Sequence, residues 1–465
     1  MLAAIVGICV ILQPNYYYNY MSLLSKLFLV GALLGSVSAR AAESDTLRLS
    51  RRDCVAIALN ESQTLKVADL EVKKTDYSKK EVLANLFPAI DFSGAYQRSI
   101  ELQSMSMNMG GMSQTIKMGT DNNWNFGFSA SMPLINASLW KSIGLSDTQI
   151  LQSLESARAS RLDLVNNVNK AYYALLLAID SRKVIRQNYE LAKLNAEVYE
   201  RQFKAGTASE YDMLRSRVQV TNVEPELLQA DIAVRQCQLQ LAVLMGIEPT
   251  ATLMPTIGLS DMQQEMYGYH MADDRSLSNN TSLRSLDLNR KLASQNVKLQ
   301  KMAWVPTLAA SFNINWNAMS NGSPFVDQHF NPYSNVGVAL QIPIFHGGSK
   351  YQKLRQAKVQ SLQLDLQRET LVNSLNMQVD LALDNINRQV NQIESSEQGM
   401  KTAVKAYEIM QKSFDIGAAS YLNLRDSEMA LTSSQLSYYQ AIYNYLVSTS
   451  ELDTLLGREA ALGIE

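Results

Sequence analysis

The sequence predicts a mainly α-helical protein with a smaller transmembrane β part, built from two related halves. Three observations support this fold class. A short pattern around Gly206 recurs around Gly417, 211 positions later, which indicates an internal repeat. Two long stretches, 134–224 and 344–465, contain no proline, as expected of long helices. Four further segments alternate large apolar residues with small or polar ones, which is typical of strands with one apolar face.

The amino-terminal part has the pattern of an export signal. Lys26 precedes the apolar run 27–34, and small residues within 37–41 offer cleavage sites. We therefore expect residues 1–41 to be an upstream extension followed by a signal peptide that starts at Met21, and the mature protein to be exported. No cysteine stands at the cleavage site, so a lipid anchor is not expected.

The composition excludes several classes of function. Basic and acidic residues almost balance, 42 against 44, which argues against nucleic acid as a partner. The three histidines, His270, His329 and His346, lack the spacing of a metal pair. No phosphate-binding loop or catalytic set is recognisable, so we predict no enzyme activity, no cofactor and no metal site. The mature chain keeps Cys54 and Cys237, which are buried thiols or a disulfide.

Each half begins with a helical segment that leads into two strands. The helical segments are 50–85 and 276–303, followed by Pro88 and Pro306. The four strand segments are 90–96, 124–133, 312–317 and 336–343. A half-exposed sheet of a soluble protein shows the same alternation, but the export signal and a length of about ten residues favour outer-membrane strands. Because bacterial barrels have at least about eight strands, four strands imply that several subunits close one barrel.

The loop between the first two strands is rich in methionine. The methionines are Met105, Met107, Met109, Met112 and Met118. Their thioether sulfurs can bind Cu(I) or Ag(I), but a polar stretch of this composition is more often a disordered surface loop. We therefore expect a disordered loop over 101–120 without a metal site.

The proline-free stretches predict long helices that turn back at the repeated pattern. A long helix is expected over about 137–202, with a heptad pattern in the part that approaches the first turn. Return helices are expected over 209–245 and 420–456. At both turns a glycine permits the left-handed end of one helix, and a serine three residues later caps the next. Pro225 occurs in the first return helix only and is expected to bend or break it.

The repeat divides the chain into parts with defined boundaries. A helix, two strands, a long helix and a return helix follow one another in the same order in both repeats. The parts are the leader 1–41, the first repeat 46–247, a connector 248–275, the second repeat 276–457 and a C-terminal tail 458–465.

The order and doubling of these parts resemble the TolC family of outer-membrane efflux channels. The resemblance extends over 47–457 and rests on the signal peptide, the doubled unit, the tip spacing Phe-x-x-Gly-x-x-Ser and the strand-ending run from Pro343 to Gly348. It implies a homotrimer in which four strands per chain form one twelve-stranded β-barrel in the outer-membrane lipid. The barrel would continue into a long α-helical coiled-coil barrel across the periplasm. The implied partners are a periplasmic adaptor and an inner-membrane pump.

The resemblance also implies which residues carry the function. The two helical tips would form the periplasmic mouth, where the adaptor docks. The tip residues are Phe203, Gly206, Ser209 and Asp212 in the first repeat and Phe414, Gly417 and Ser420 in the second. Asn423 and Asp426 stand where relatives constrict the entrance. Asp426 is equally explained as a solvated carboxylate that the helix dipole favours.

The leading hypothesis is a passive exit channel for small molecules in a tripartite efflux system. The conduit of a type I protein secretion system is the alternative within the same family. A secreted coiled-coil fibre or adhesin is the alternative from another class, and the four amphipathic strands argue against it.

Overall fold

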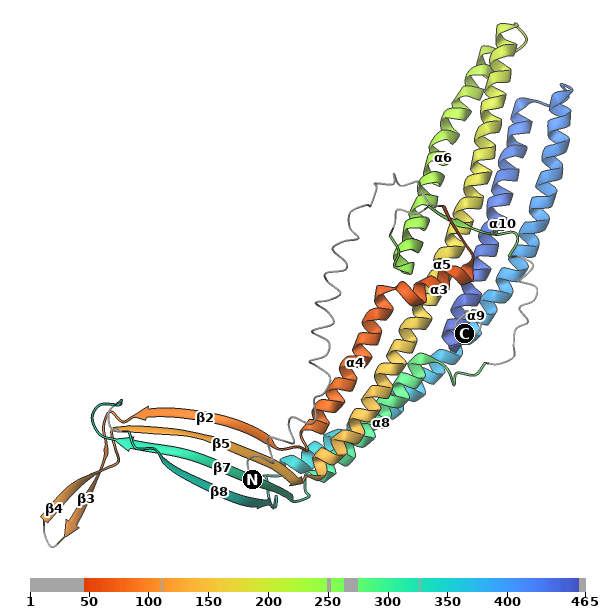
Figure 1. The fold of residues 1–465 in the computed structure, drawn as a ribbon. Helices are drawn as coiled ribbons and strands as arrows, with labels where there is room; N and C mark the ends of the chain where they lie inside the picture. The colour runs from red at the N-terminus through yellow and green to blue at the C-terminus, as the bar shows by residue number, and fades with distance from the viewer. Residues whose placement is uncertain (1–45, 110–111, 249–251, 263–274, 326–327, 460–465) are drawn as a thin grey trace, which may run out of the picture. The chain divides into compact units, whose positions relative to one another are not determined.

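The computed structural model describes residues 46–109, 112–248, 252–262, 275–325 and 328–459 (Figure 1). The chain divides into two compact units. The described residues of the smaller unit, 46–47 and 252–254, belong to the strands β1 (Thr46–Leu49) and β6 (Thr252–Pro255), which form a two-stranded sheet. The larger unit carries all other described elements.

The larger unit is mostly helical in its described part. Its helices are α3 (Arg51–Glu61), α4 (Gln63–Ala84), α5 (Ala137–Lys204), α6 (Glu210–Met245), α8 (Thr281–Met302), α9 (Ser349–Asp415) and α10 (Tyr421–Leu456). α5 contains 68 residues and α9 contains 67, which corresponds to roughly 100 Å for each helix at about 1.5 Å per residue. Every described helix lacks the combination of length and hydropathy that a membrane span requires.

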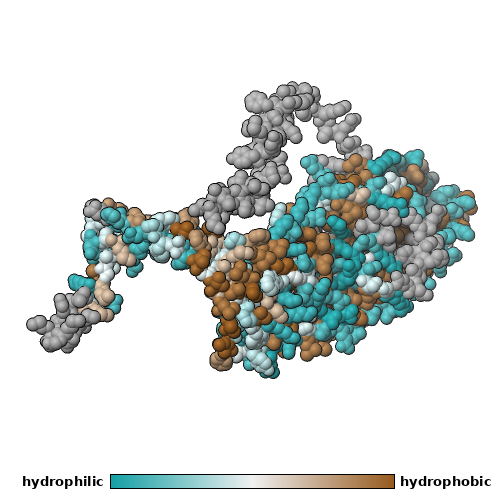
Figure 2. All heavy atoms as spheres, turned by 60° about the horizontal axis from the view of Figure 1, so that its bottom comes forward, coloured by the Kyte–Doolittle hydropathy of each residue, from teal (hydrophilic) through white to brown (hydrophobic). Residues whose placement is uncertain are grey.

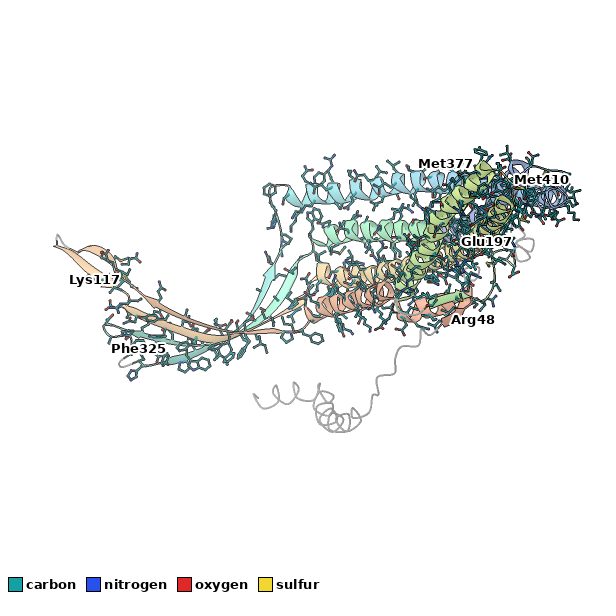
Figure 3. All side chains as sticks on the ribbon, turned by 90° about the horizontal axis from the view of Figure 1, so that it is seen from above. Arg48, Lys117, Glu197, Phe325, Met377 and Met410 are labelled. Atoms are coloured by element: carbon teal, nitrogen blue, oxygen red, sulfur yellow. The ribbon has the colours of Figure 1, made fainter. Side chains whose placement is uncertain are left out.

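The helices pack side by side in a row. Figure 3 shows α4, α5, α8 and α9 next to one another in this order, and α5 also packs against α6 and α10, while α9 packs against α10. Two shorter helices therefore cover each flank of α5 in series, as the short return helices predicted. The helices α4, α6 and α9 lie at the edges of this row, because each has one flank that packs against no described helix of the row.

Side-chain caps fix where the helices begin. The capping residues are Ser50, Asn136, Ser209, Asn280 and Ser420, and each accepts a hydrogen bond from the backbone N–H three residues later. Of the bend or break expected at Pro225, the break is wrong, because α6 runs through it without interruption, and the bend stays a prediction. Pro225 and Thr221, whose carbonyl loses its helical donor, are both exposed in the single chain, so the packing of this chain does not bury that carbonyl.

A network of charged side chains joins the first half of the chain to the second. Glu155 on α5 is 5% exposed and lies between two guanidinium groups. Its Oε1 atom is 2.9 Å from Nη1 of Arg158, and its Oε2 atom is 3.3 Å from Nε of Arg284 on α8. Arg158 also pairs with Glu459, just beyond the end of α10. The carboxylate of Glu155 is therefore buried but compensated.

The two cysteines in the described part of the chain are free thiols. Cys54 on α3 is buried, and Cys237 on α6 is half-buried. Burial raises the pKa of the Cys54 thiol to about 12. Of the two alternatives left open by the sequence, the structure supports thiols.

Four antiparallel strands form the main sheet of the larger unit, in the order β2-β5-β7-β8. They are β2 (Ala89–Arg98), β5 (Asn122–Ile135), β7 (Thr307–Ser320) and β8 (Asn331–Gln341). Directly paired residues share one face of a sheet, so Phe92, Phe128 and Ile314 lie on the same face. The adjacent row, which begins with Asp91 and Ser129, lies on the opposite, polar face. The predicted alternation is confirmed, although β7 and β8 begin earlier than expected.

The methionine-rich stretch forms a hairpin, so the expectation of a disordered loop is wrong. β3 (Gln103–Met109) pairs antiparallel with β4 (Met112–Met118). The alternation of methionine with serine and asparagine has the period of two that suits a strand. The structure does not describe the side chains of 106–116. The hypothesis that thioether sulfurs of this stretch bind a metal depends on them and stays a prediction.

Candidate docking tips and entrance

The first tip joins α5 to α6 through a left-handed glycine. Gly206 has φ = 75°, and its N–H donates to the carbonyl of Phe203 at 2.9 Å. The next N–H donates to the carbonyl of Gln202 at 2.9 Å, which closes the last turn of α5. Ser209 then accepts a hydrogen bond from the N–H of Asp212 at 3.1 Å and donates its hydroxyl to the Asp212 carboxylate at 2.6 Å. These contacts begin α6.

The second tip repeats this backbone arrangement between α9 and α10. Gly417 has φ = 77°, and its N–H donates to the carbonyl of Phe414 at 2.9 Å. The following N–H donates to the carbonyl of Ser413 at 2.8 Å. Ser420 accepts a hydrogen bond from the N–H of Asn423 at 3.3 Å. The helical turns predicted from the glycines and serines are confirmed, whereas docking of a partner on them stays a prediction.

The side chains at the two tips differ although the backbones agree. Phe203 is 39% exposed. Its counterpart Phe414 packs toward Tyr199, with ring centroids 6.4 Å apart, and Tyr199 also contacts Tyr421 at 4.9 Å. This aromatic seam (Tyr199, Phe414 and Tyr421) connects α5 of the first hairpin with α9 and α10 of the second. The two hairpins are therefore joined close to their tips.

A carboxylate is buried just behind the aromatic seam. Glu428 on α10 is 7% exposed, and its Oε1 atom accepts a hydrogen bond from Nδ2 of Asn195 on α5 at 3.3 Å. Burial raises the pKa of Glu428, against the smaller lowering effects of Asn195 and Arg425. Burial, with a smaller contribution from Glu428, also raises the pKa of Tyr407 and of Tyr421. This buried acid therefore lies at the contact between the two hairpins.

Replacing Glu428 by glutamine is expected to stabilise the protein at neutral pH. The pKa of Glu428 is raised in the folded state, so its ionisation costs folding free energy once the pH exceeds the ordinary glutamate value. Glutamine keeps the acceptor for Asn195 and never ionises. The gain should be on the order of 1 kcal/mol at pH 7 and should vanish near pH 4. Urea unfolding followed by circular dichroism at both pH values measures it.

The control for this prediction is an exposed glutamate on α5. Glu197, labelled in Figure 3, is exposed, so Glu197→Gln should change stability by less than about 0.5 kcal/mol at either pH. If Glu428→Gln instead lowers the unfolding midpoint at pH 7, the charge of Glu428 is stabilised in the fold, and the assignment above is wrong.

Asn423 and Asp426 lie outside the aromatic seam. Both are exposed, and their spacing of three residues makes them neighbours on one face of α10. Tyr421, Leu424 and Glu428 are buried on another face of the same helix. The structure therefore leaves the side chains of Asn423 and Asp426 free to face solvent, and their role in a constriction stays a prediction.

Sequence reasoning missed Glu428 and Asn195. The sequence does contain a signal of the buried acid. Tyr421, Leu424 and Glu428 follow the 3,4 spacing of a packed helix face, and the third of these positions carries a charge. A carboxylate at such a position is costly unless it has a partner. Its partner comes from a different helix, more than two hundred positions away, and no local pattern identifies it.

The described residues contain no cluster of three or more histidine, cysteine, aspartate or glutamate side chains that could hold a metal ion. His329 and His346 belong to the described part of the chain. His270 and the connector residues 263–274 lie outside it.

Comparisons with known proteins agree with this architecture. The family described as "Outer membrane efflux protein" matches residues 55–247 and 274–458. The outer membrane protein TolC of Vibrio cholerae is 21% identical over 333 residues, which cover 71% of this chain and 76% of that protein. The alkaline protease secretion protein AprF of Pseudomonas aeruginosa is 24% identical over 333 residues, covering 70% and 67%. A crystal structure of CusC superposes with a TM-score of 0.70 at 19% identity, covering 91% of this chain and 95% of the other.

Proposed function

Because the chain belongs to the family of outer membrane efflux proteins, we propose that it is the outer-membrane exit channel of a tripartite efflux system. The protein resides in the outer membrane, as its TolC relatives do. In our proposal it conducts small molecules passively from the periplasm to the exterior when a periplasmic adaptor and an inner-membrane pump engage it. The observation that carries the proposal is the sheet with one apolar and one polar face, attached to two long helical hairpins.

The edges of the sheet support assembly with further copies. β2 and β8 are the outer strands of the four-stranded sheet, so each leaves one side of its backbone without a partner in the sheet. Four strands are too few for a closed barrel, which needs about eight or more. Pairing β8 of one copy with β2 of the next is a head-to-tail contact, which closes a ring when the rotation between copies divides a full turn. The family resemblance favours three copies and twelve strands.

The edges of the helical row carry apolar side chains that suit the same ring. Apolar residues remain at the surface of the helical part (Figure 2). Those exposed on α6 include Tyr211, Leu214, Val218, Leu228 and Ile232, and those on α9 include Val359, Leu362, Leu366, Met377 and Leu381. Both sets follow 3,4 spacing over part of their length, as in coiled-coil contacts. We propose that α6 and α4 of one copy pack on α9 of the next to form the helical barrel.

The two faces of the sheet suit this assembly. In a closed barrel of this kind, the apolar face with Phe92, Phe128 and Ile314 would contact lipid, and the polar face would line the passage. The tips would lie at the opposite, periplasmic end, where Gly206 and Gly417 present two similar turns to an adaptor. Asn423 and Asp426, exposed just beyond the second tip, would face the entrance and constrict it.

The proposal is tested by single-channel conductance of the purified protein in planar lipid bilayers. We expect small openings that divalent cations block, because three Asp426 carboxylates would form a ring that concentrates cations. Asp426→Ala should weaken this block by about tenfold or more. Asp76→Ala, on α4 and paired with Lys80, is the control and should behave like wild type. No conductance from the wild type would refute the channel, and an unchanged block would remove Asp426 from the entrance.

Protein export is a second candidate function. The observation that favours it is the similarity to AprF, whose name states a role in protease secretion. A conduit for an unfolded polypeptide uses the same passage and the same tips. Measuring export of small molecules and of secreted proteins in a deletion strain, with and without the gene restored, separates the two candidates.

A further inference from the structure

The polar face of the sheet is lined by neutral amide side chains. The register aligns Ser129, Asn313 and Asn335 in one row with Asp91. Successive rows on the same face place Gly127 beside Asn315, and Asn125 beside Asn317 and Asn331. The dominant group on this face is therefore the carboxamide, a dipole that donates and accepts hydrogen bonds without a net charge.

Three of these amides are held in place by neighbours. Nδ2 of Asn313 donates a hydrogen bond to Oδ1 of Asn335 at 2.9 Å. The side chain of Asn315 lies over Gly127, in the space that a Cβ atom at this position would occupy. The amide lining is consequently part of the packed surface of the sheet.

Only two residues of β2, β5, β7 and β8 carry a formal charge at neutral pH, namely Asp91 and Arg98. Arg98 is the last residue of β2 and is paired with Asn122. Because an odd number of positions separates Arg98 from Asp91, its side chain belongs to the opposite, apolar face of the sheet. Asp91 is the third residue of β2, close to the end of the sheet that follows α4, and it is exposed. It is thus the single formal charge on the polar face of these strands.

We propose that Asp91 is the ion-selectivity determinant of the membrane passage. This inference rests on the proposed function, in which the polar face lines the passage. Copies of Asp91 from the subunits would form one acidic ring in an otherwise neutral, amide-lined channel. The ring attracts cations, and the amides do not repel anions, so the preference for cations is modest. Because salt screens a charge within about 10 Å at 0.1 M, the preference falls at high salt.

The experiment is the reversal potential of the purified trimer under a KCl gradient in planar bilayers. To exclude a contribution from the entrance, all variants are made in the Asp426→Ala background. Asp91→Asn should lower the cation-to-anion permeability ratio by about two- to threefold, and Asp91→Lys should reverse the preference to anions. Asp91→Glu, which keeps the charge, is the matched control and should keep the starting ratio. Asn313→Asp adds a carboxylate to the same row and should raise the ratio.

Single-channel conductance from the same recordings shows whether each variant forms a channel. An unchanged reversal potential in both Asp91→Asn and Asp91→Lys, with normal openings, would overturn the role of Asp91 and leave the proposed channel intact. The absence of openings from the unmodified protein would overturn the proposed function itself. If Asp91→Lys does not assemble, Asp91→Asn and Asn313→Asp, which change the side chain little, still decide the outcome.

Discussion

Replacing Arg158 by methionine is expected to lower the free energy of unfolding by about 3 to 5 kcal/mol, because it leaves a buried charge without its main partner. Arg158 pairs with Glu155 at 2.9 Å and with Glu459 at 2.5 Å. It also donates to the carbonyl oxygens of Asn279 at 3.0 Å and Gly457 at 3.2 Å. Methionine fills much of the space but satisfies none of these groups. The loss should appear as a lower urea midpoint of the helical signal.

Two further variants make the Arg158 prediction specific. Arg161 pairs with Asp69 at 3.4 Å, and both side chains are more than half exposed (52% and 54%), so Arg161→Met should cost less than about 1 kcal/mol. Combining Arg158→Met with Glu155→Gln should recover part of the loss, since the buried carboxylate that has lost its main partner is then gone. Equal midpoints for Arg158→Met and Arg161→Met would show that the network does not contribute to stability.

Gly457→Ala is expected to be far more damaging than Gly417→Ala, although both glycines follow the end of a helix in a left-handed conformation. Gly457 has φ = 68° and Gly417 has φ = 77°. A Cβ atom at Gly457 would collide with the backbone carbonyl of Asn279, whereas nothing lies within 4 Å of one at Gly417. Gly417→Ala should therefore cost only the left-handed strain, about 1 to 2 kcal/mol. Gly457→Ala must also move a backbone segment and should cost about 3 kcal/mol or more.

The two glycine variants are compared by the urea midpoint and by the yield of folded protein. Gly246 offers an internal replicate, because a Cβ atom there would lie 2.7 Å from the carbonyl oxygen of Glu61. Gly246→Ala should accordingly resemble Gly457→Ala. If all three variants lose the same stability, the close carbonyl contacts have no energetic consequence and left-handed strain alone decides the cost.

Local chemistry explains what could be predicted from the sequence. The tips depend on a glycine and a serine within a few positions of one another, and the strands depend on an alternation that is visible residue by residue. Glu428 could not be placed in the same way, because its hydrogen bond from Asn195 joins helices that are distant in sequence. The charged network around Arg158 is likewise assembled from separate helices.

The expected break at Pro225 and the expected disordered loop over 101–120 are wrong, because context outweighed a local rule. Pro225 lacks the N–H that a helix needs, but it lies on an exposed face of α6, where packing of the other face against α5 keeps the helix continuous. The methionine-rich stretch looked like a loop by composition, yet its alternation has the period of a strand and pairs with itself. In both cases the position of a residue on its element decided the outcome more than its type.

The contacts of Gly246 and Gly457 also bear on the origin of the chain. Gly246, which ends α6, lies against the carbonyl of Glu61 in the same half, and Gly457, which ends α10, lies against the carbonyl of Asn279 in the other half. Glu61 and Asn279 each directly precede the N-cap position of the next helix, Ser62 or Asn280. Each half thus closes its own end onto its own beginning. This is the arrangement expected if one ancestral segment was self-contained before its gene was duplicated and fused.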